Sequence, residues 1–261
     1  MVRTMNEMHE INLINFGAAY LLLLLVFAIM KKCKVNQSKL LLVASIRMTL
    51  QLVLAGLVLT YIIQNPHPAF TVIFLCAMTG FAMYTILSRN KEINPRFKAV
   101  VACSLGLCGL SIVTVFITLI IGVSFFNPQF TIPISGMILG NAMTGVGLGL
   151  KTFNENIKSG ALRIETLINI GVRPSKILMP FVNRALETAL LPTLNSMLGM
   201  GIIFLPGMMT GQILSGTLPT TAILYQIAIL IAICTVTCLS VFCSLYFGSK
   251  TLYNKKNQIV V

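Results

Sequence analysis

The stretch of sequence that decides the fold is PTTAILYQIAILIAICTVTCLSVFCSLYF, residues 219–247, which contains no charged residue. A helix needs about 20 apolar residues to cross the hydrocarbon core of a bilayer, and this run exceeds that length. Six further apolar runs lie at about 11–30, 40–63, 69–88, 99–123, 132–150 and 186–205. The sequence therefore predicts an all-α, polytopic membrane protein with about seven transmembrane helices in a single domain, residues 1–261.

The composition of the chain excludes several classes of protein. The 261 residues have a mean hydropathy of +0.90, and only 10% of them are charged. Soluble domains carry about 25% charged residues, so a soluble enzyme is excluded. The six acidic residues are all Glu, and a chain without Asp does not suit a carboxylate cage for calcium. The 19 basic residues form short clusters between apolar runs, which is typical of cytoplasmic membrane loops and not of a nucleic-acid interface.

The distribution of basic residues predicts the orientation of the chain. Of the 19 Lys and Arg residues, 18 follow the first, third, fifth or seventh apolar run. The connections at 64–68, 124–130 and 206–218 contain none. The positive-inside rule then places the N-terminus outside and the C-terminus inside. The charged cluster of the first run follows the apolar stretch and no small-residue cleavage site is seen, so we expect a retained helix and not a signal peptide.

One long cytoplasmic loop, residues 151–184, is expected between the fifth and sixth spans. Within it, residues 155–170 have an amphipathic period that puts apolar side chains on one side: Ile157, Ala161, Ile164, Leu167 and Ile168. Gly171 and Pro174 then predict a turn, since proline restricts the residue before it. A second short helix leads into the sixth span. The loop is therefore predicted to be a helix, a glycine-containing turn and a helix.

The same loop carries a motif: Glu165-Thr166-Leu167, then Gly171 after three residues, then Ile177-Leu178-Met179-Pro180. This motif resembles the EAA loop of ABC-transporter permeases, whose coupling helix docks in a cleft of a separate ATPase subunit. The resemblance implies coupling roles for Glu165, Thr166, Gly171, Arg173 and Pro174. Leu167 and Met179 depart from the family pattern, and an ordinary interfacial helical hairpin is the alternative interpretation.

Two longer segments, IPISGMILGNAMTGVGLGL (132–150) and ALLPTLNSMLGMGIIFLPGMMTGQILSG (189–216), extend the resemblance. They are similar to the FetB family of bacterial metal-export permeases and to the plant aluminium-tolerance permeases. The resemblance covers nearly the whole chain. It implies the permease subunit of an ABC transporter in the cell membrane that exports metal ions such as iron. Asn195 is neutral at a position where the family often has an acid, so no role of that charge is transferred.

The implied partners are an ABC ATPase subunit and a second copy of the permease, with ATP and Mg bound by the ATPase. The chain contains no G-x-x-x-x-G-K-[ST] motif, so it is not expected to be an enzyme or to bind a cofactor of its own. An ABC permease for a nucleotide sugar or an organic cation is one alternative, and a secondary transporter is another. A membrane-embedded enzyme is disfavoured because no general acid–base pair can be assembled.

Polar and conformationally unusual residues within the spans are candidates for a translocation path. We expect the glycine-rich fifth span to be a closely packed helix, either central in the bundle or facing a second copy, with Asn141 bonding across it. Glu187 is either a cation relay or the partner of Arg184 in an ion pair. The non-helical segment from Pro206 is either an outer turn or part of the path. The candidates are Asn141, Met143, Glu187, Asn195, Pro206, Gly207, Met208 and Met209; no disulfide framework or metal site is predicted from the seven cysteines.

Overall fold

The computed structural model describes residues 13–90 and 93–253, which are helical with no strand among them. This confirms the expected all-α class. The long helices are α1 (Leu13–Lys32), α2 (Ser38–Gln64), α3 (Pro68–Arg89), α4 (Pro95–Val115), α5 (Pro128–Ser159), α7 (Pro174–Gly199) and α9 (Pro219–Ser249). Shorter elements are α6 (Ala161–Asn169), α8 (Gly207–Leu214), the π-helical η1 (Phe116–Ile121) and the 3₁₀ turn η2 (Lys250–Leu252).

The helices begin where the sequence supplies proline and asparagine. Helices α3, α4, α5, α7 and α9 each start with a proline in the first turn, where the missing N–H costs no helical hydrogen bond. Two asparagines also cap helices. The side chain of Asn94 accepts from the N–H of Arg96 at 3.2 Å, and that of Asn127 accepts from Gln129 at 3.1 Å. Local sequence therefore fixes most of the helix starts.

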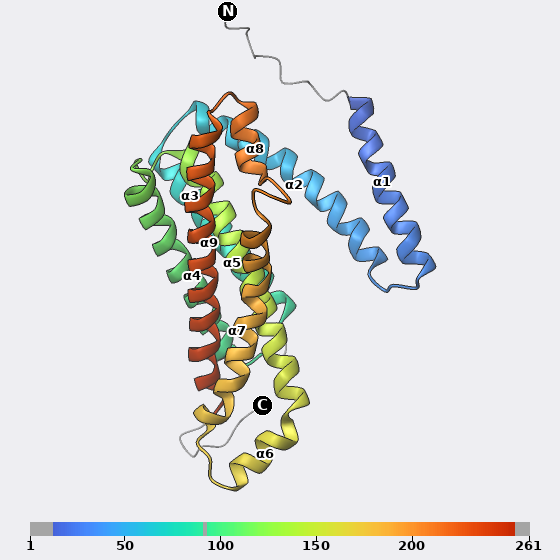
Figure 1. Ribbon diagram of the computed structural model, residues 1–261, viewed down its shortest axis with the longest axis vertical. Helices are drawn as coiled ribbons and strands as arrows, with labels where there is room; N and C mark the ends of the chain where they lie inside the picture. The colour runs from blue at the N-terminus through green and yellow to red at the C-terminus, as the bar shows by residue number, and fades with distance from the viewer. Residues whose placement is uncertain (1–12, 91–92, 254–261) are drawn as a thin grey trace, which may run out of the picture.

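Helix α5 lies at the centre of a bundle with α3, α4, α7 and α9 (Figure 1). The close approach of α5 to α9 depends on glycine. A Cβ atom at Gly145 would overlap the side chain of Thr237, and one at Gly149 would lie 2.9 Å from a methyl group of Val241. Gly140 and Gly147 have no neighbour within 4 Å of such an atom. The expected close packing of the fifth span is therefore confirmed, and it depends on Gly145 and Gly149.

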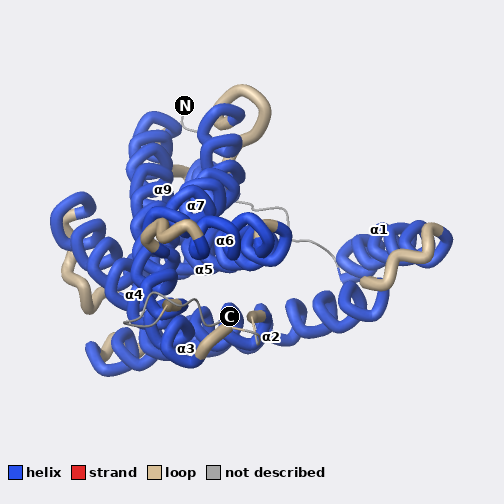
Figure 2. Tube along the Cα trace, turned by 90° about the horizontal axis from the view of Figure 1, so that it is seen from below, coloured by secondary structure: helices blue, strands red, loops and turns tan. Residues whose placement is uncertain are grey.

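Helices α1 and α2 form a hairpin in which α1 stands away from the bundle and α2 runs from the hairpin turn to the bundle, as both views show (Figures 1 and 2). The two helices are joined by a 2.6 Å hydrogen bond between the hydroxyls of Tyr20 and Thr49. The guanidinium of Arg47 packs over the ring of Phe81 on α3, 5.3 Å from its centroid. Most large apolar side chains of the hairpin are exposed. The hairpin therefore presents an apolar surface to its surroundings.

Within residues 13–90 and 93–253, five helical stretches are long and apolar enough to cross a bilayer: Ser38–Gln64, Pro68–Arg89, Pro95–Ile121, Pro128–Ser159 and Pro219–Leu252. They match five of the expected spans, and the chain is a multi-pass membrane protein. The count of seven spans and the orientation stay predictions.

One predicted boundary was wrong. The sixth span was expected to continue to residue 205, but α7 ends at Gly199, and Gly201 has a φ of +81° that a right-handed helix cannot contain. Helix α5 continues without a break beyond the predicted end of the fifth span, to Ser159. The second loop helix is also not separate, since α7 starts at Pro174 and runs through it.

Candidate functional site

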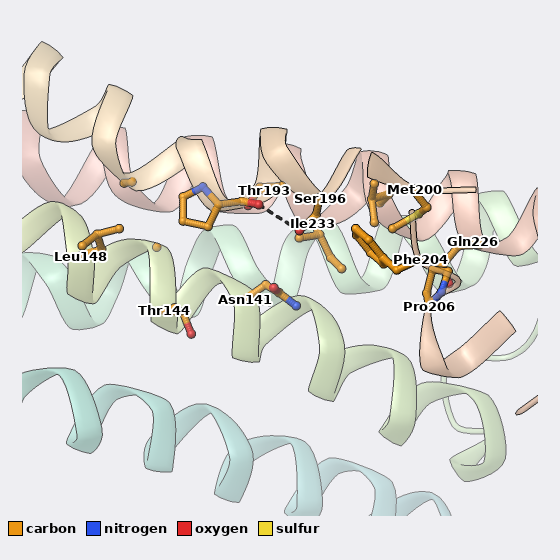
Figure 3. Close-up of a pocket in the computed structure, with 14 residues that line it drawn as sticks. Asn141, Thr144, Leu148, Thr193, Ser196, Met200, Phe204, Pro206, Gln226 and Ile233 are labelled. Atoms are coloured by element: carbon orange, nitrogen blue, oxygen red, sulfur yellow. Dashed lines mark hydrogen bonds between the residues drawn. The ribbon is translucent and has the colours of Figure 1, made fainter. Parts of the chain in front are cut away.

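A cavity of about 210 Å³ lies between α5, α7 and α9, and the segment 200–206 forms its wall at one end (Figure 3). Helix α5 contributes one wall, α7 the second and α9 the third. The residues that line it are Asn141, Thr144, Gly145, Leu148, Ala189, Pro192, Thr193, Ser196, Met200, Phe204, Pro206, Gln226, Leu230 and Ile233. None of these carries a charge, and five of them have polar side chains.

The segment that closes the cavity is a tight turn. The N–H of Gly201 donates to the carbonyl of Phe204 at 3.0 Å, and the N–H of Ile203 donates to the carbonyl of Gly199 at 2.9 Å. Gly201 adopts a left-handed conformation, which a glycine tolerates without a steric penalty. Pro206 then caps the start of α8. The break around Pro206 therefore contains a tight turn at residues 199–204 and also supplies cavity wall.

Three of the five polar side chains of the cavity wall donate hydrogen bonds to the backbone of their own helices. The Nδ2 of Asn141 donates to the carbonyl of Met137 at 2.7 Å, and the hydroxyl of Thr144 donates to that of Gly140 at 3.0 Å. The hydroxyl of Ser196 donates to the carbonyl of Pro192 at 2.9 Å, the dashed line in Figure 3. A hydroxyl has one proton and two lone pairs, so these oxygens still offer lone pairs as acceptors.

Gln226 stands out among the lining residues. It is 7% exposed, and its Oε1 atom has no hydrogen-bond partner. Buried polar atoms are nearly always hydrogen-bonded, so an unpartnered acceptor in a cavity wall calls for an explanation. Thr237, Ser240 and Ser244 of the same helix also have buried hydroxyls without a partner. Helix α9 therefore carries unsatisfied polar atoms in the middle of an otherwise apolar bundle.

The structure brings only some of the predicted path residues together. Asn141 and Pro206 line the cavity, and Asn141 bonds within α5 and not across to another helix as expected. Met143 and Met208 are half-buried against the apolar core, and Met209 is buried. Asn195, Glu187 and Gly207 are exposed and do not line the cavity.

The expected ion pair between Arg184 and Glu187 is not formed in the part of the chain that the structure describes. Both side chains are exposed on α7, three residues apart. The conservative interpretation of Glu187 as an ion-pair partner was therefore wrong.

The loop between α5 and α7 forms an elbow, which we define as α6 and the turn through Gly171 to Pro174. The N–H of Gly171 donates to the carbonyl of Ile168 at 2.9 Å, and that of Val172 donates to the carbonyl of Leu167 at 3.0 Å. These two bonds are the Schellman pattern that ends a helix, and Gly171 has the left-handed φ of +84° that it requires. Arg173 precedes α7, whose first residue is the buried Pro174. The predicted turn at Gly171 is confirmed.

The two faces of α6 differ. Ile164 is buried and Leu167 and Ile168 pack on the core, as the amphipathic period predicts, although Ala161 is exposed. Glu165 and Thr166 are exposed. Leu162 is 79% exposed at the start of α6, and Ile170 is 69% exposed just after its end. The elbow therefore presents two large apolar side chains beside the polar residues of the motif.

Sequence reasoning missed most of the cavity. Gln226, Thr144, Thr193 and Ser196 were not singled out. One signal could have found Gln226, because it is the only amide side chain in the run 219–247. The contact between the thiols of Cys108 and Cys243 was also not predicted. It joins α4 to α9, and the two residues are too far apart in the sequence for their spacing to indicate a contact.

Comparisons with known proteins agree with this architecture. The family model described as Uncharacterised protein family (UPF0014) matches residues 13–253. The chain is 34% identical over 213 residues to Protein ALUMINUM SENSITIVE 3 of Arabidopsis thaliana, covering 82% of this chain and 77% of that protein. It is 30% identical over 257 residues to Probable iron export permease protein FetB of Escherichia coli (strain K12), covering 97% and 98% of the two chains. No solved structure matches the chain.

Proposed function

Because the chain belongs to the UPF0014 family of membrane proteins, we propose that it is the transmembrane permease subunit of an ABC transporter. In this proposal it exports metal ions such as iron, and a separate ATPase subunit hydrolyses the ATP. The observation that carries the proposal is the elbow, which combines the motif of Glu165 and Gly171 with an exposed apolar face. The similarity to an iron export permease over nearly the whole chain supports the choice of cargo.

The elbow lies at one end of the bundle, and α8 with the segment 200–206 lies at the other (Figure 1). Leu162 and Ile170 project from the elbow. Exposed large apolar side chains rimmed by polar residues mark protein–protein contacts. A groove on the ATPase subunit would bury both side chains, and Glu165 and Thr166 would lie at the rim of that contact.

Continuous helices link the elbow to the cavity. Helix α5 runs without a break from Thr144, in the cavity wall, to Ser159 beside the elbow. At 1.5 Å per residue this distance is about 22 Å. Helix α7 starts at the elbow and reaches the cavity at Ala189. A displacement of α6 by the ATPase would therefore reach two of the three cavity walls as rigid-body movement.

Two copies of the chain are needed in this proposal, because each chain has one elbow and the ATPase of an ABC transporter consists of two subunits that close on each other. The exposed face of α7 supports a second copy. Glu187 and Asn195 project from this face, and polar side chains facing lipid at membrane depth are costly. Contact with a second copy or with a water-filled path would remove that cost.

The test compares two matched substitutions at exposed leucines. Leu162→Ser changes the elbow, and Leu218→Ser changes a 70% exposed leucine just before α9, far from the elbow. The chain is purified in mild detergent from its host with the co-eluting ATPase, and ATP-driven uptake of Fe(II) into inside-out vesicles is measured. We expect Leu162→Ser to lose both the bound ATPase and the transport, and Leu218→Ser to keep both.

Two results would contradict the proposal. Equal ATPase binding and transport in both variants would remove the docking role of the elbow. A chain that elutes without any ATPase and moves its cargo under a proton gradient would be a secondary transporter.

A further inference from the structure

The elbow and the first turn of α7 carry basic side chains around the exposed apolar ones. Arg163 lies on α6 next to Leu162, Arg173 directly precedes α7, and Lys176 lies in the first turn of α7. All three basic side chains are exposed, and Glu165 is the one acidic residue between positions 160 and 177. Among the residues that the structure describes, none of the three forms an ion pair. The positive charge of this surface is therefore not neutralised within the chain.

The start of α7 concentrates this positive charge. The N-terminus of a helix carries a partial positive charge from its free N–H groups, so basic side chains beside it are locally unfavourable. Helix α7 has no acidic residue in its first turn, and its N-cap residue, Arg173, makes no side-chain hydrogen bond to the helix. The start of α7 is therefore an uncapped positive end with two cations beside it, and carboxylates from a partner would remove the local cost.

The basic and the apolar side chains share one exposed surface. Leu162, Thr166 and Ile170 follow one another at four-residue steps, which places them on one side of α6, and all three are exposed. Arg163 is three residues from Thr166 and is therefore its neighbour on the helix surface. Arg173 follows Ile170 after the short turn. A partner that covers this surface therefore needs an apolar groove with negative charges at its rim.

The elbow lies past the end of the predicted fifth span. That span ends near residue 150, and α5 continues through residues 151–159, about 13 Å along the helix. The polar headgroup layer on one side of a bilayer is only about 5–8 Å thick. Figure 1 likewise shows α6 beyond the ends of α4 and α9. The charges of the elbow therefore lie beyond the lipid phosphates, which favours a protein partner over anionic lipid.

We infer that the surface of the ATPase that receives the elbow is acidic: an apolar groove for Leu162 and Ile170, with carboxylates at its rim that pair with the basic side chains. Those side chains are Arg163, Arg173 and Lys176. The inference rests on the proposed function, because it names the chemistry of the partner surface at the docking site. Opposite charges across an interface raise the association rate and exclude wrong partners. The basic side chains therefore set how fast, and with which ATPase, the elbow associates.

The test measures how fast the ATPase that co-elutes with the native chain binds again after separation. The full-length chain is placed in nanodiscs of phosphatidylcholine, which has no net charge, and association is followed by surface plasmon resonance. One variant combines Arg173→Glu with Lys176→Glu. The matched control combines Arg89→Glu with Arg96→Glu, two exposed basic residues at the end of α3 and the start of α4. Both variants change the net charge of the chain by the same amount.

We expect the variant at Arg173 and Lys176 to associate about tenfold more slowly than the native chain at low salt, because electrostatic steering raises association rates by about this factor or more. The control at Arg89 and Arg96 should associate at the native rate. The native chain should also associate more slowly as salt rises from about 0.01 M to about 1 M, since the Debye length then falls from about 30 Å to about 3 Å. This salt dependence tests the inference without any substitution.

Three results would overturn the inference. They are an association rate that does not depend on salt, an equal loss in the two double variants, and a variant at Arg173 and Lys176 that binds the ATPase normally but no longer co-purifies with anionic phospholipid. The last result would assign the charges to the membrane. In all three cases the ATPase still binds, so the proposed function stands and only the acidic partner surface fails. If no ATPase co-elutes with the native chain, the proposed function fails and the inference fails with it.

Discussion

Replacing Gly171 tests whether the geometry of the elbow couples ATP hydrolysis to transport. Gly171 has a φ of +84°, and a Cβ atom there would meet nothing within 4 Å. The effect of Gly171→Ala is therefore conformational and not steric. A left-handed conformation costs an ordinary L-residue about 1–2 kcal/mol. We expect the population of the correctly bent elbow to fall about 5- to 30-fold relative to alternatives, the factor that this free energy represents.

The assay is ATP-driven uptake of Fe(II) into inside-out vesicles that contain the chain and its ATPase, with the amount of each protein measured. Transport per complex should fall by a similar factor in Gly171→Ala. The thermal stability of the bundle should change little, since Gly171 is exposed and lies outside the bundle core. Gly56→Ala in α2, where a Cβ atom also meets nothing within 4 Å, is the control and should transport normally.

A second substitution separates backbone strain from side-chain size. Asparagine tolerates the left-handed region far better than alanine and commonly ends helices in this way. Gly171→Asn should therefore transport better than Gly171→Ala, although its side chain is larger. Native transport in Gly171→Ala would refute the reasoning, and so would an asparagine variant that is worse than the alanine variant.

Three further predictions concern packing, charge and topology. Gly145→Val should lower the free energy of unfolding by about 1–3 kcal/mol, because the new side chain overlaps Thr237. Gly140→Ala should leave the free energy of unfolding unchanged, because a Cβ atom there meets nothing within 4 Å. The melting temperatures of the two purified variants test this, and equal values would contradict the close packing of α5 on α9. Glu187→Gln should keep the native melting temperature, because the carboxylate has no ion pair with Arg184, and a clear drop would show a structural role. Labelling of single cysteines from outside the cell tests the predicted orientation, and a labelling result opposite to the expected one at any site would contradict that orientation. Labelling is expected at Asn65→Cys, Asn127→Cys and Thr217→Cys, and not at Cys33, Asn94→Cys or Lys158→Cys.

Much of the fold could be predicted because a membrane-spanning helix can be recognised from its own stretch of sequence. A span needs only length and apolarity, and prolines and asparagines mark where α3, α4 and α5 begin. The helix bounds that could not be predicted depend on tertiary structure. A separate helix was expected over residues 155–170, but α5 continues through 151–159, where Phe153 and Ile157 are buried against the bundle.

The site was harder to predict than the fold. The elbow has a contiguous motif, so Gly171 and its turn could be found by pattern. The cavity is assembled from α5, α7, α9 and the turn at 200–206, which are far apart in the sequence. Thr144 and Ser196 look like ordinary hydroxyls that bond to their own helix, and only the packing of three helices brings both residues to the wall of one cavity. No spacing rule in one segment carries that information.

The packing also indicates which wall of the cavity can move. Gly145 and Gly149 allow α5 to pack closely against α9, so we expect these two cavity walls to move as one rigid unit. Helix α7 contains Pro180 between the elbow and the cavity and Pro192 in the cavity wall itself. Each proline removes one helical hydrogen bond, and helices bend at such points. Under the proposed function, a push on the elbow would therefore move α5 together with α9 as one unit and would bend α7 and the turn at 200–206 relative to it.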